Sequence, residues 1–128
     1  MKVEHFEILV EEPSMEAFLT ECLPRLLGDA VTFKIYTHQG KPDLFRKLAA
    51  RLRAYSRWLP TNYRILVITD LDGDNCAELK GRMESAAAMA GLSTRSTSGS
   101  ASWQTVNRIA IEELEAWFFG DWSSVVEA

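Results

Sequence analysis

Strand-like and helix-like segments alternate along this chain of 128 residues, and that alternation constrains its fold more than any other feature. Short β-branched runs predict strands, and the amphipathic runs between them have helical spacing. The expected strands are His5–Val10, Val31–Tyr36, Arg64–Thr69 and Trp103–Ile111; the expected helices are Met15–Leu27, a helix from Gly40–Asp43 to about Leu59, Cys76–Ala90 and Glu112–Val126. Such a pattern is typical of a parallel sheet with helices on both faces and right-handed crossovers.

The sheet is expected to have the strand order 2-1-3-4, within a three-layer α/β/α domain of the Rossmann-like type. With that order, the first and third strands are neighbours at the centre of a four-stranded, mainly parallel sheet. No internal repeat and no break in composition divides the chain, so we expect a single domain over residues 1–128.

Carboxylates directly follow two of the predicted strands. Asp70, Asp72 and Asp74 come after the third strand, and Glu11 comes after the first. Ligands collect at the carboxyl ends of parallel strands, and the strand order brings Glu11 and Asp70 to the same edge. Oxygen ligands of this kind suit Mg²⁺ or Mn²⁺, so the pattern predicts a shared metal site. The alternative is structural, because Asp and Gly form turns and acids are favoured at helix starts.

Other polar residues fall near the same edge. Glu113 and Glu115 lie where the fourth strand ends, and two-metal phosphoryl chemistry needs several carboxylates. Lys41 and His38 follow the second strand, and the lysine ammonium could hold a phosphate. The ordinary explanations are the helix dipole for the acids and a solvated turn for Lys41.

The charge distribution limits the partners. The formal net charge is −4, so no overall basic field attracts nucleic acid or anionic lipid. From Lys41 to Arg64, however, seven basic residues stand against the single acid Asp43. This local excess either contacts phosphates or forms the solvated side of an amphipathic helix.

Cysteine usage and the amino terminus indicate the compartment. Cys22 and Cys76 fall in separate predicted helices without metal-ligand spacing, which is typical of reduced thiols. No basic leader with an apolar core opens the chain, and no apolar run reaches membrane-spanning length. We therefore expect a cytoplasmic protein without membrane association.

Two further segments predict a surface loop or lid and a contact surface. Ser93–Ser102 is rich in Ser, Thr and Gly, which predicts a flexible surface loop or a substrate lid. The last predicted helix carries too many aromatic side chains for one core-facing stripe: Trp117, Phe118, Phe119 and Trp122. Because exposed aromatic clusters mark contact surfaces, we expect a homodimer or a longer natural chain to cover them.

Four groups of residues carry a resemblance to a known family. They are Val10-Glu11-Glu12-Pro13-Ser14 with Glu16, Gly40-Lys41-Pro42-Asp43-Leu44, Asp70-Leu71-Asp72 with Asp74 and Cys76, and Asn107-Arg108-Ile109-Ala110-Ile111-Glu112-Glu113-Leu114-Glu115-Ala116-Trp117. A glutamate after strand one and Asp-x-Asp after strand three resemble the Toprim catalytic domain of primases, topoisomerases and overcoming-lysogenization-defect nucleases. The full set resembles, nearly end to end, a bacterial Toprim-like family known as domain of unknown function 4276.

The resemblance implies an Mg²⁺-dependent nuclease-like core that acts on nucleic acid. Glu11, Asp70 and Asp72 match the metal carboxylates, with Glu11 as a ligand or general base and Lys41 against phosphate charge. An ATPase partner in phage-defence or mobile-element operons is also implied. The chain departs from the Toprim pattern at Glu12, where glycine is usual, and longer members continue past the equivalent of Val126.

Two rival interpretations remain open. The first is a non-catalytic Toprim-like interaction module whose acids bind a structural ion or nothing. The second is a response-receiver-like switch, which also has acids after the first and third strands. A receiver expects a lysine after a late strand, and no lysine occurs beyond Lys80.

Overall fold

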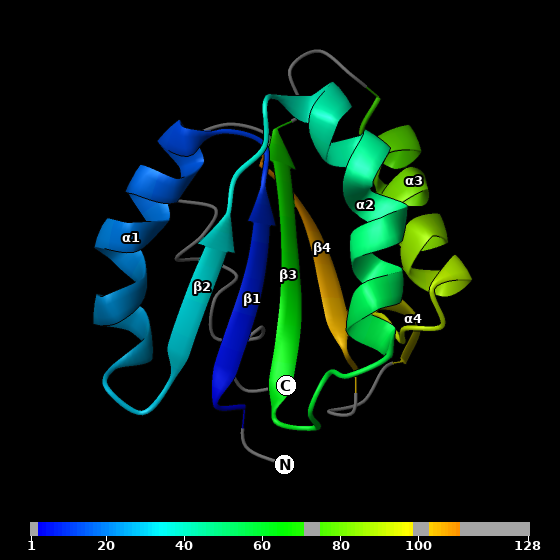
Figure 1. Ribbon diagram of the computed structural model, residues 1–128. Helices are drawn as coiled ribbons and strands as arrows, with labels where there is room; N and C mark the ends of the chain where they lie inside the picture. The colour runs from blue at the N-terminus through cyan, green and yellow to red at the C-terminus, as the bar shows by residue number, and fades with distance from the viewer. Residues whose placement is uncertain (1–2, 71–74, 99–102, 111–128) are drawn as a thin grey trace.

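The computed structural model describes residues 3–70, 75–98 and 103–110. The strands are β1 (His5–Val10), β2 (Thr32–Tyr36), β3 (Tyr63–Asp70) and β4 (Thr105–Ala110), and the helices are α1 (Pro13–Leu27), α2 (Lys41–Ser56), α3 (Cys76–Met89) and the short α4 (Arg95–Ser98). Figure 1 shows the strands side by side, with their carboxyl ends at the top. The helix predicted over residues 112–126, with its aromatic cluster, lies outside the described residues.

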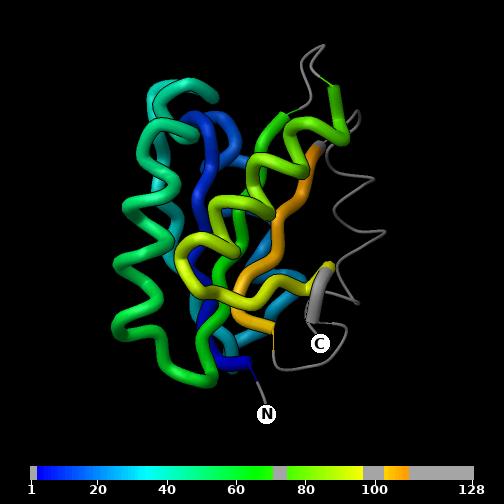
Figure 2. Tube along the Cα trace, turned by 90° about the vertical axis from the view of Figure 1, so that its right-hand side faces the viewer, coloured from blue at the N-terminus to red at the C-terminus, as the bar shows by residue number. Residues whose placement is uncertain are grey.

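The sheet has the strand order β2-β1-β3-β4, and its three pairings are all parallel. This confirms the predicted order. Helix α1 covers one face of the sheet, while α2 and α3 lie side by side on the other (Figures 1 and 2). The domain is therefore a three-layer α/β/α fold of the Rossmann-like type, as the alternation of elements predicts.

Alternating strand residues supply a core on each face of the sheet. On β1, Phe6, Ile8 and Val10 join the core beneath α1, whereas Leu9 joins the core beneath α2 and α3. Trp103, just before β4, is fully buried in the α1 core. Burying a large apolar side chain stabilises the fold by about 1.5–3 kcal/mol, so these two cores hold the sheet that positions the strand ends.

Glycines end or precede helices where the backbone needs a positive φ. Gly28 follows α1 with φ +72°, and its N–H donates to the carbonyl of Pro24 (3.1 Å). The helix therefore ends where the sequence predicts. Helix α2 ends at Ser56, short of the predicted Leu59, because the following N–H groups of Arg57 and Trp58 make tighter three-residue turns.

The expectation of a flexible loop from Ser93 is wrong for its described part. Thr94 is buried, forms an isolated bridge with Thr105, and donates a hydrogen bond from its hydroxyl to Glu84 (2.7 Å). Ser93 accepts backbone hydrogen bonds from the N–H groups of Gln104 and Thr105. These bonds fix the segment against the start of β4, a pairing that a polar composition does not reveal.

The described helices also bear on membrane association and on the thiols. None of them combines the length and the apolar composition needed to cross a bilayer. Cys22 is buried, Cys76 is exposed, and neither forms a disulfide.

Candidate functional site

Glu11 lies at the centre of the carboxyl edge of the sheet. It follows β1 directly and is buried, with 5% of its surface exposed. Because Val10 pairs with Ile68 in parallel, the residue after β1 lies against the end of β3. Glu11 Oε2 accepts hydrogen bonds from the Thr69 hydroxyl and from the backbone N–H of Asp70 (2.5 Å). The two acidic strand ends therefore meet, as the strand order predicts.

Within the described residues, the hydrogen bonds of Glu11 involve only one of its two carboxylate oxygens. Both bonds fall on Oε2, and Oε1 receives none from the part of the chain that the structure describes. The Thr69 and Asp70 donors hold the carboxylate in one orientation. An oriented carboxylate oxygen at a strand end suits a hard cation or an attacking water.

Of the other predicted ligands, the structure describes only Asp70. Asp70 is the last residue of β3 and is partly exposed. Asp72, Asp74, Glu113 and Glu115 lie outside the described residues, so their approach to Glu11 stays a prediction. The described residues by themselves contain no group of three His, Cys, Asp or Glu side chains that could hold a metal ion.

Gly40 joins the start of α2 to the Glu11 strand end. Its φ of +89° is a conformation that side chains disfavour, and its N–H donates to the Glu11 carbonyl (2.9 Å). Lys41 is the first residue of α2, so its backbone begins at the edge where Glu11 lies. The predicted proximity of the Gly40-Lys41 turn to Glu11 is thus confirmed.

His38 is buried beside the same edge. Its Nδ1 lies 2.7 Å from the Val10 carbonyl, and its Nε2 has no partner within the described ranges. Since a carbonyl only accepts, Nδ1 carries the proton and Nε2 holds the lone pair of the neutral ring. Burial is the main cause that lowers the pKa of His38.

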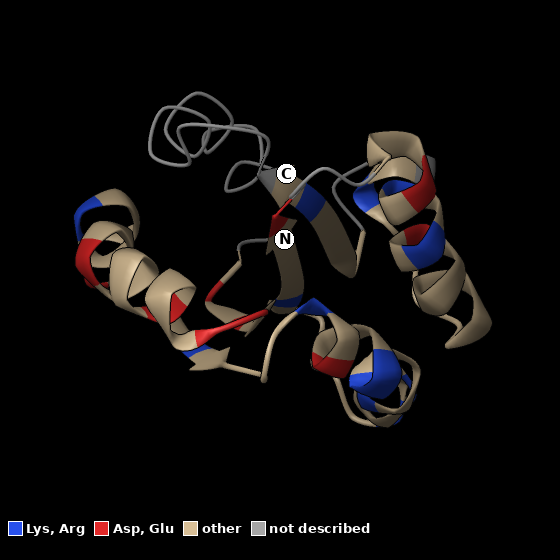
Figure 3. Cartoon of the chain, turned by 90° about the horizontal axis from the view of Figure 1, so that it is seen from above, with Lys and Arg blue, Asp and Glu red and all other residues tan. Residues whose placement is uncertain are grey.

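Asp43 anchors the first turn of α2. Its carboxylate accepts the backbone N–H of Gln39 (3.0 Å) and pairs with Arg46 and Lys47. The Gln39 bond, with the Lys47 and Arg46 bonds, lowers the pKa of Asp43 to about 2. In the view from above the carboxyl edge, the ribbon of α2 shows basic positions in blue beside acidic and uncharged ones (Figure 3).

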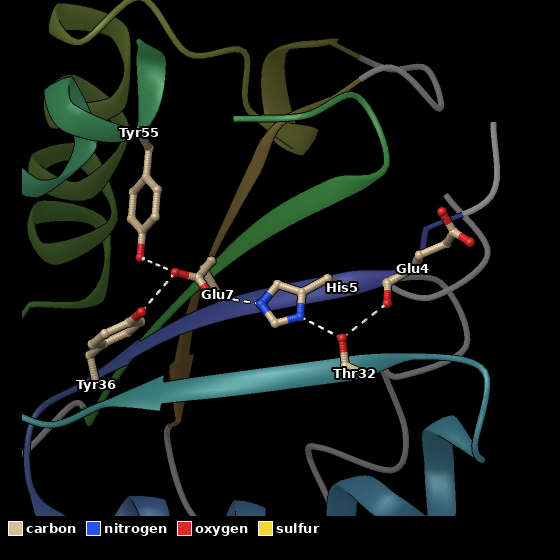
Figure 4. Close-up of polar contacts among 6 residues, drawn as sticks. All are labelled: Glu4, His5, Glu7, Thr32, Tyr36 and Tyr55. Carbon is tan, nitrogen blue, oxygen red and sulfur yellow. Dashed lines mark hydrogen bonds and ion pairs between the residues drawn. The ribbon is translucent and has the colours of Figure 1, made fainter. Parts of the chain in front are cut away.

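Sequence reasoning missed the buried carboxylate of Glu7. Its Oε1 accepts hydrogen bonds from the hydroxyls of Tyr36 (3.0 Å) and Tyr55 (3.1 Å), and its Oε2 lies 2.7 Å from His5 Nε2 (Figure 4). Burial, with the Glu7 carboxylate, raises the pKa of both tyrosines. The sequence does contain a signal for this cluster: Glu7 stands in the middle of an apolar strand, and a carboxylate buried there requires hydrogen-bond partners.

A family comparison matches nearly the whole chain. The model described as Domain of unknown function (DUF4276) matches residues 10–128. The chain belongs to this family. Glu11, Lys41 and Asp70 fall within the part matched to DUF4276, whereas Glu7 precedes it. No curated protein and no solved structure matches the chain.

Proposed function

We propose that this DUF4276 domain is an Mg²⁺-dependent, nuclease-like domain of the Toprim type, which cleaves phosphodiesters or transfers phosphoryl groups. The meeting of Glu11 with the end of β3 supports the proposal. This contact lies at the carboxyl end of β1, between the neighbouring strands β2 and β3, where the strand order reverses. Ligands of open parallel sheets usually bind at such a point.

The residues at this edge have distinct roles in the proposal. Glu11 would bind the metal through Oε1 or accept a proton from the attacking water, and Asp70 and Asp72 would complete the ligand set. Lys41 would neutralise charge on the phosphate. Mg²⁺ or Mn²⁺, when bound, supplies Lewis-acid stabilisation of the phosphoryl oxygens.

Mn²⁺ titration of thermal unfolding tests the metal part of the proposal. Saturable binding should raise the melting temperature, with a stabilisation of about 2.7 kcal/mol at a free Mn²⁺ concentration about 100 times Kd. Asp70→Asn and Glu11→Gln should abolish this response. Glu21→Gln, which removes an exposed carboxylate on α1, is the matched control and should keep it.

Cleavage of labelled DNA and RNA, single-stranded and double-stranded, tests the chemistry. Activity should require Mg²⁺ or Mn²⁺ and should be lost in Asp70→Asn but kept in Glu21→Gln. An unchanged Mn²⁺ response in Asp70→Asn would reject Asp70 as a ligand. Metal binding without cleavage of any of these substrates would contradict the nuclease proposal.

One observation favours a second candidate, a non-catalytic interaction module. Glu11 already accepts two hydrogen bonds from the end of β3, and these could serve only to join the strand ends. In that case Mn²⁺ has no effect on unfolding, and Glu11→Gln destabilises the protein without metal. The module would then dock a partner, for which the family resemblance suggests an ATPase.

A further inference from the structure

An exposed tryptophan follows the end of helix α2. Trp58 has 52% of its surface exposed, although two aromatic side chains contact its ring. The ring centroids of Tyr55 and Tyr63 lie 5.6 Å and 6.1 Å from that of Trp58. The Trp58 N–H also donates to the Tyr55 carbonyl (3.1 Å). These contacts hold the indole in place while much of its surface stays open to a ligand.

The exposed ring does not belong to a broad apolar surface. Met89 is the other large apolar side chain that is exposed among the described residues, and it lies on α3. The chain neighbours of Trp58 are the exposed Arg57 and the half-buried Leu59. Protein interfaces are usually built around a core of several apolar side chains. A single ring beside positive charge fits the flat face of a smaller group better.

Arginines on α2 form a row that leads to this ring. Arg46 and Arg53 are seven residues apart, and Arg57 follows four residues later at the end of the helix. Residues at these spacings lie on the same side of a helix. All three arginines are exposed, and Ala49 and Ala50, which lie between them along the helix, are small. No bulky side chain therefore separates the guanidinium groups along this side.

The arginines of this row remain accessible to an anionic ligand. Arg46 pairs with Asp43, yet 70% of its side-chain surface is exposed. Arg53 and Arg57 form no ion pair with an acid of the described residues. The exposed Glu4, an acid at the amino end of the sheet, is bonded to the turn before β3. Solvated guanidinium groups of this kind bind phosphate oxygens and stack on planar rings.

The row connects the two ends of the sheet. Lys41 begins α2 at the carboxyl edge, whereas Trp58 contacts Tyr63, the first residue of β3, at the amino edge. Figure 1 shows α2 running alongside the strands between these edges. With a rise of about 1.5 Å per residue, the 16 residues of α2 span about 24 Å. A ligand that contacts the whole row is therefore a chain with several phosphates, not one small anion.

We propose that the outer side of α2 binds single-stranded nucleic acid, with backbone phosphates on Arg46, Arg53 and Arg57 and an unpaired base stacked on Trp58. These four residues are called the α2 track. A single strand has both of the required features, because its phosphates repeat along the chain and its bases expose flat faces. A duplex offers phosphates as well, but its bases are paired and stacked on one another.

The α2 track names a substrate class for the proposed nuclease, and in that respect it rests on the proposed function. A strand bound along the track would extend from Trp58 toward the carboxyl edge, where Glu11 and Asp70 meet. Binding to the track itself requires no metal. It is therefore measurable with EDTA present, whether or not the domain cleaves its ligand.

Fluorescence anisotropy of labelled oligothymidylate and oligouridylate, with EDTA present, tests the α2 track. Single strands should bind about tenfold more tightly than the same oligothymidylate annealed to oligoadenylate. Charge alone would favour the duplex, whose phosphates are denser, so this preference reports base stacking. Trp58→Ala should weaken single-strand binding about tenfold, and Trp58→Phe, which keeps an aromatic face, should retain most of the affinity.

The arginines are tested through the salt dependence of binding. Arg57→Gln should reduce the slope of log affinity against log salt concentration by about 0.7, the value for one lost phosphate contact with a single strand. Arg25→Gln removes an exposed arginine from α1, on the other face of the sheet, and is the matched control. It should leave the slope unchanged and alter affinity less than about twofold. Because Arg57 is exposed, its variant carries the test even if Trp58→Ala unfolds.

Several results would overturn the proposal. They are equal affinity for single strands and duplex, equal effects of Arg57→Gln and Arg25→Gln, and no binding of either oligonucleotide. Self-association in sedimentation that Trp58→Ala abolishes, without oligonucleotide binding, would instead make this side of α2 an interface between copies of the chain. Single-strand binding through the α2 track without metal-dependent cleavage would support the track and contradict only the proposed function.

Discussion

Two carboxylates show how differently an acid can be held in this domain. Asp43 draws its partners from its own helix and from Gln39 just before it, and the Lys47 and Arg46 side chains that bind it are largely exposed. Glu7 draws its partners from three elements, β1, β2 and α2, and both it and Tyr55 are buried. The stability lost when Asp43 is replaced should therefore depend on pH. The stability lost when a member of the Glu7 cluster is replaced should come mainly from broken buried contacts.

Asp43 should contribute stability that disappears in acid. Its folded pKa of about 2 lies below the ordinary 3.8, so the contribution is present above the ordinary value and is lost as pH falls to about 2. Asp43→Asn should lower the melting temperature at neutral pH, and the difference from wild type should shrink between those two pKa values. The exposed Asp29→Asn is the control, and a pH-independent difference for Asp43→Asn would contradict the prediction.

Tyr55 should stabilise the fold, and this stabilisation should be lost at alkaline pH. Tyr55→Phe removes a buried hydroxyl bound to Glu7, and urea unfolding should show a loss of about 1–3 kcal/mol. The folded pKa is raised above the ordinary 10.0, so this contribution is complete below that pH and declines as pH rises beyond it. Tyr63→Phe, whose hydroxyl makes no hydrogen bond within the described residues, should lose less. Equal losses in both variants would refute the role of the Glu7 bond.

At the scale of elements, strand periodicity and strand order carry most of what the sequence can predict. They place β1 beside β3 and so bring Glu11 to Asp70, because parallel neighbours end at the same edge. The partners of Glu7 could not be predicted in the same way. They depend on the register of β1 with β2 and on the approach of Tyr55 from α2, which are set by packing of the whole sheet.

A polar contact between α3 and β4 offers a test at this scale. The side-chain amide of buried Asn107 donates from Nδ2 to Glu84 (2.8 Å), and its backbone carbonyl accepts from Lys80 Nζ (2.8 Å). Asn107→Asp replaces the donor with a second acid facing Glu84, and should destabilise the fold by about 2–4 kcal/mol in urea unfolding. Adding Glu84→Gln should recover much of the loss, and no recovery would contradict the contact as its cause.

At the scale of the molecule, helix α2 carries a local excess of basic residues within a chain of net charge −4. Helix α2 starts with Lys41 at the edge where Glu11 and Asp70 meet, and further basic residues follow along the helix (Figure 3). A basic helix that starts at this edge is what the proposed phosphate-bearing substrate and the proposed metal would require. The strand order that creates the edge was predictable from the sequence, whereas the burial of His38 beside it was not, because that burial depends on the hydrogen bond between the His38 ring and the Val10 carbonyl.

The position of a bound Mn²⁺ ion tests the central claim most directly. Anomalous scattering from crystals soaked in Mn²⁺ should place the ion at the carboxyl edge, about 2.0–2.3 Å from carboxylate oxygens of Glu11 and Asp70. Asp72 should provide a further ligand at a similar distance. The absence of an anomalous peak at this edge, or a peak bound only by residues elsewhere, would contradict the metal-dependent account.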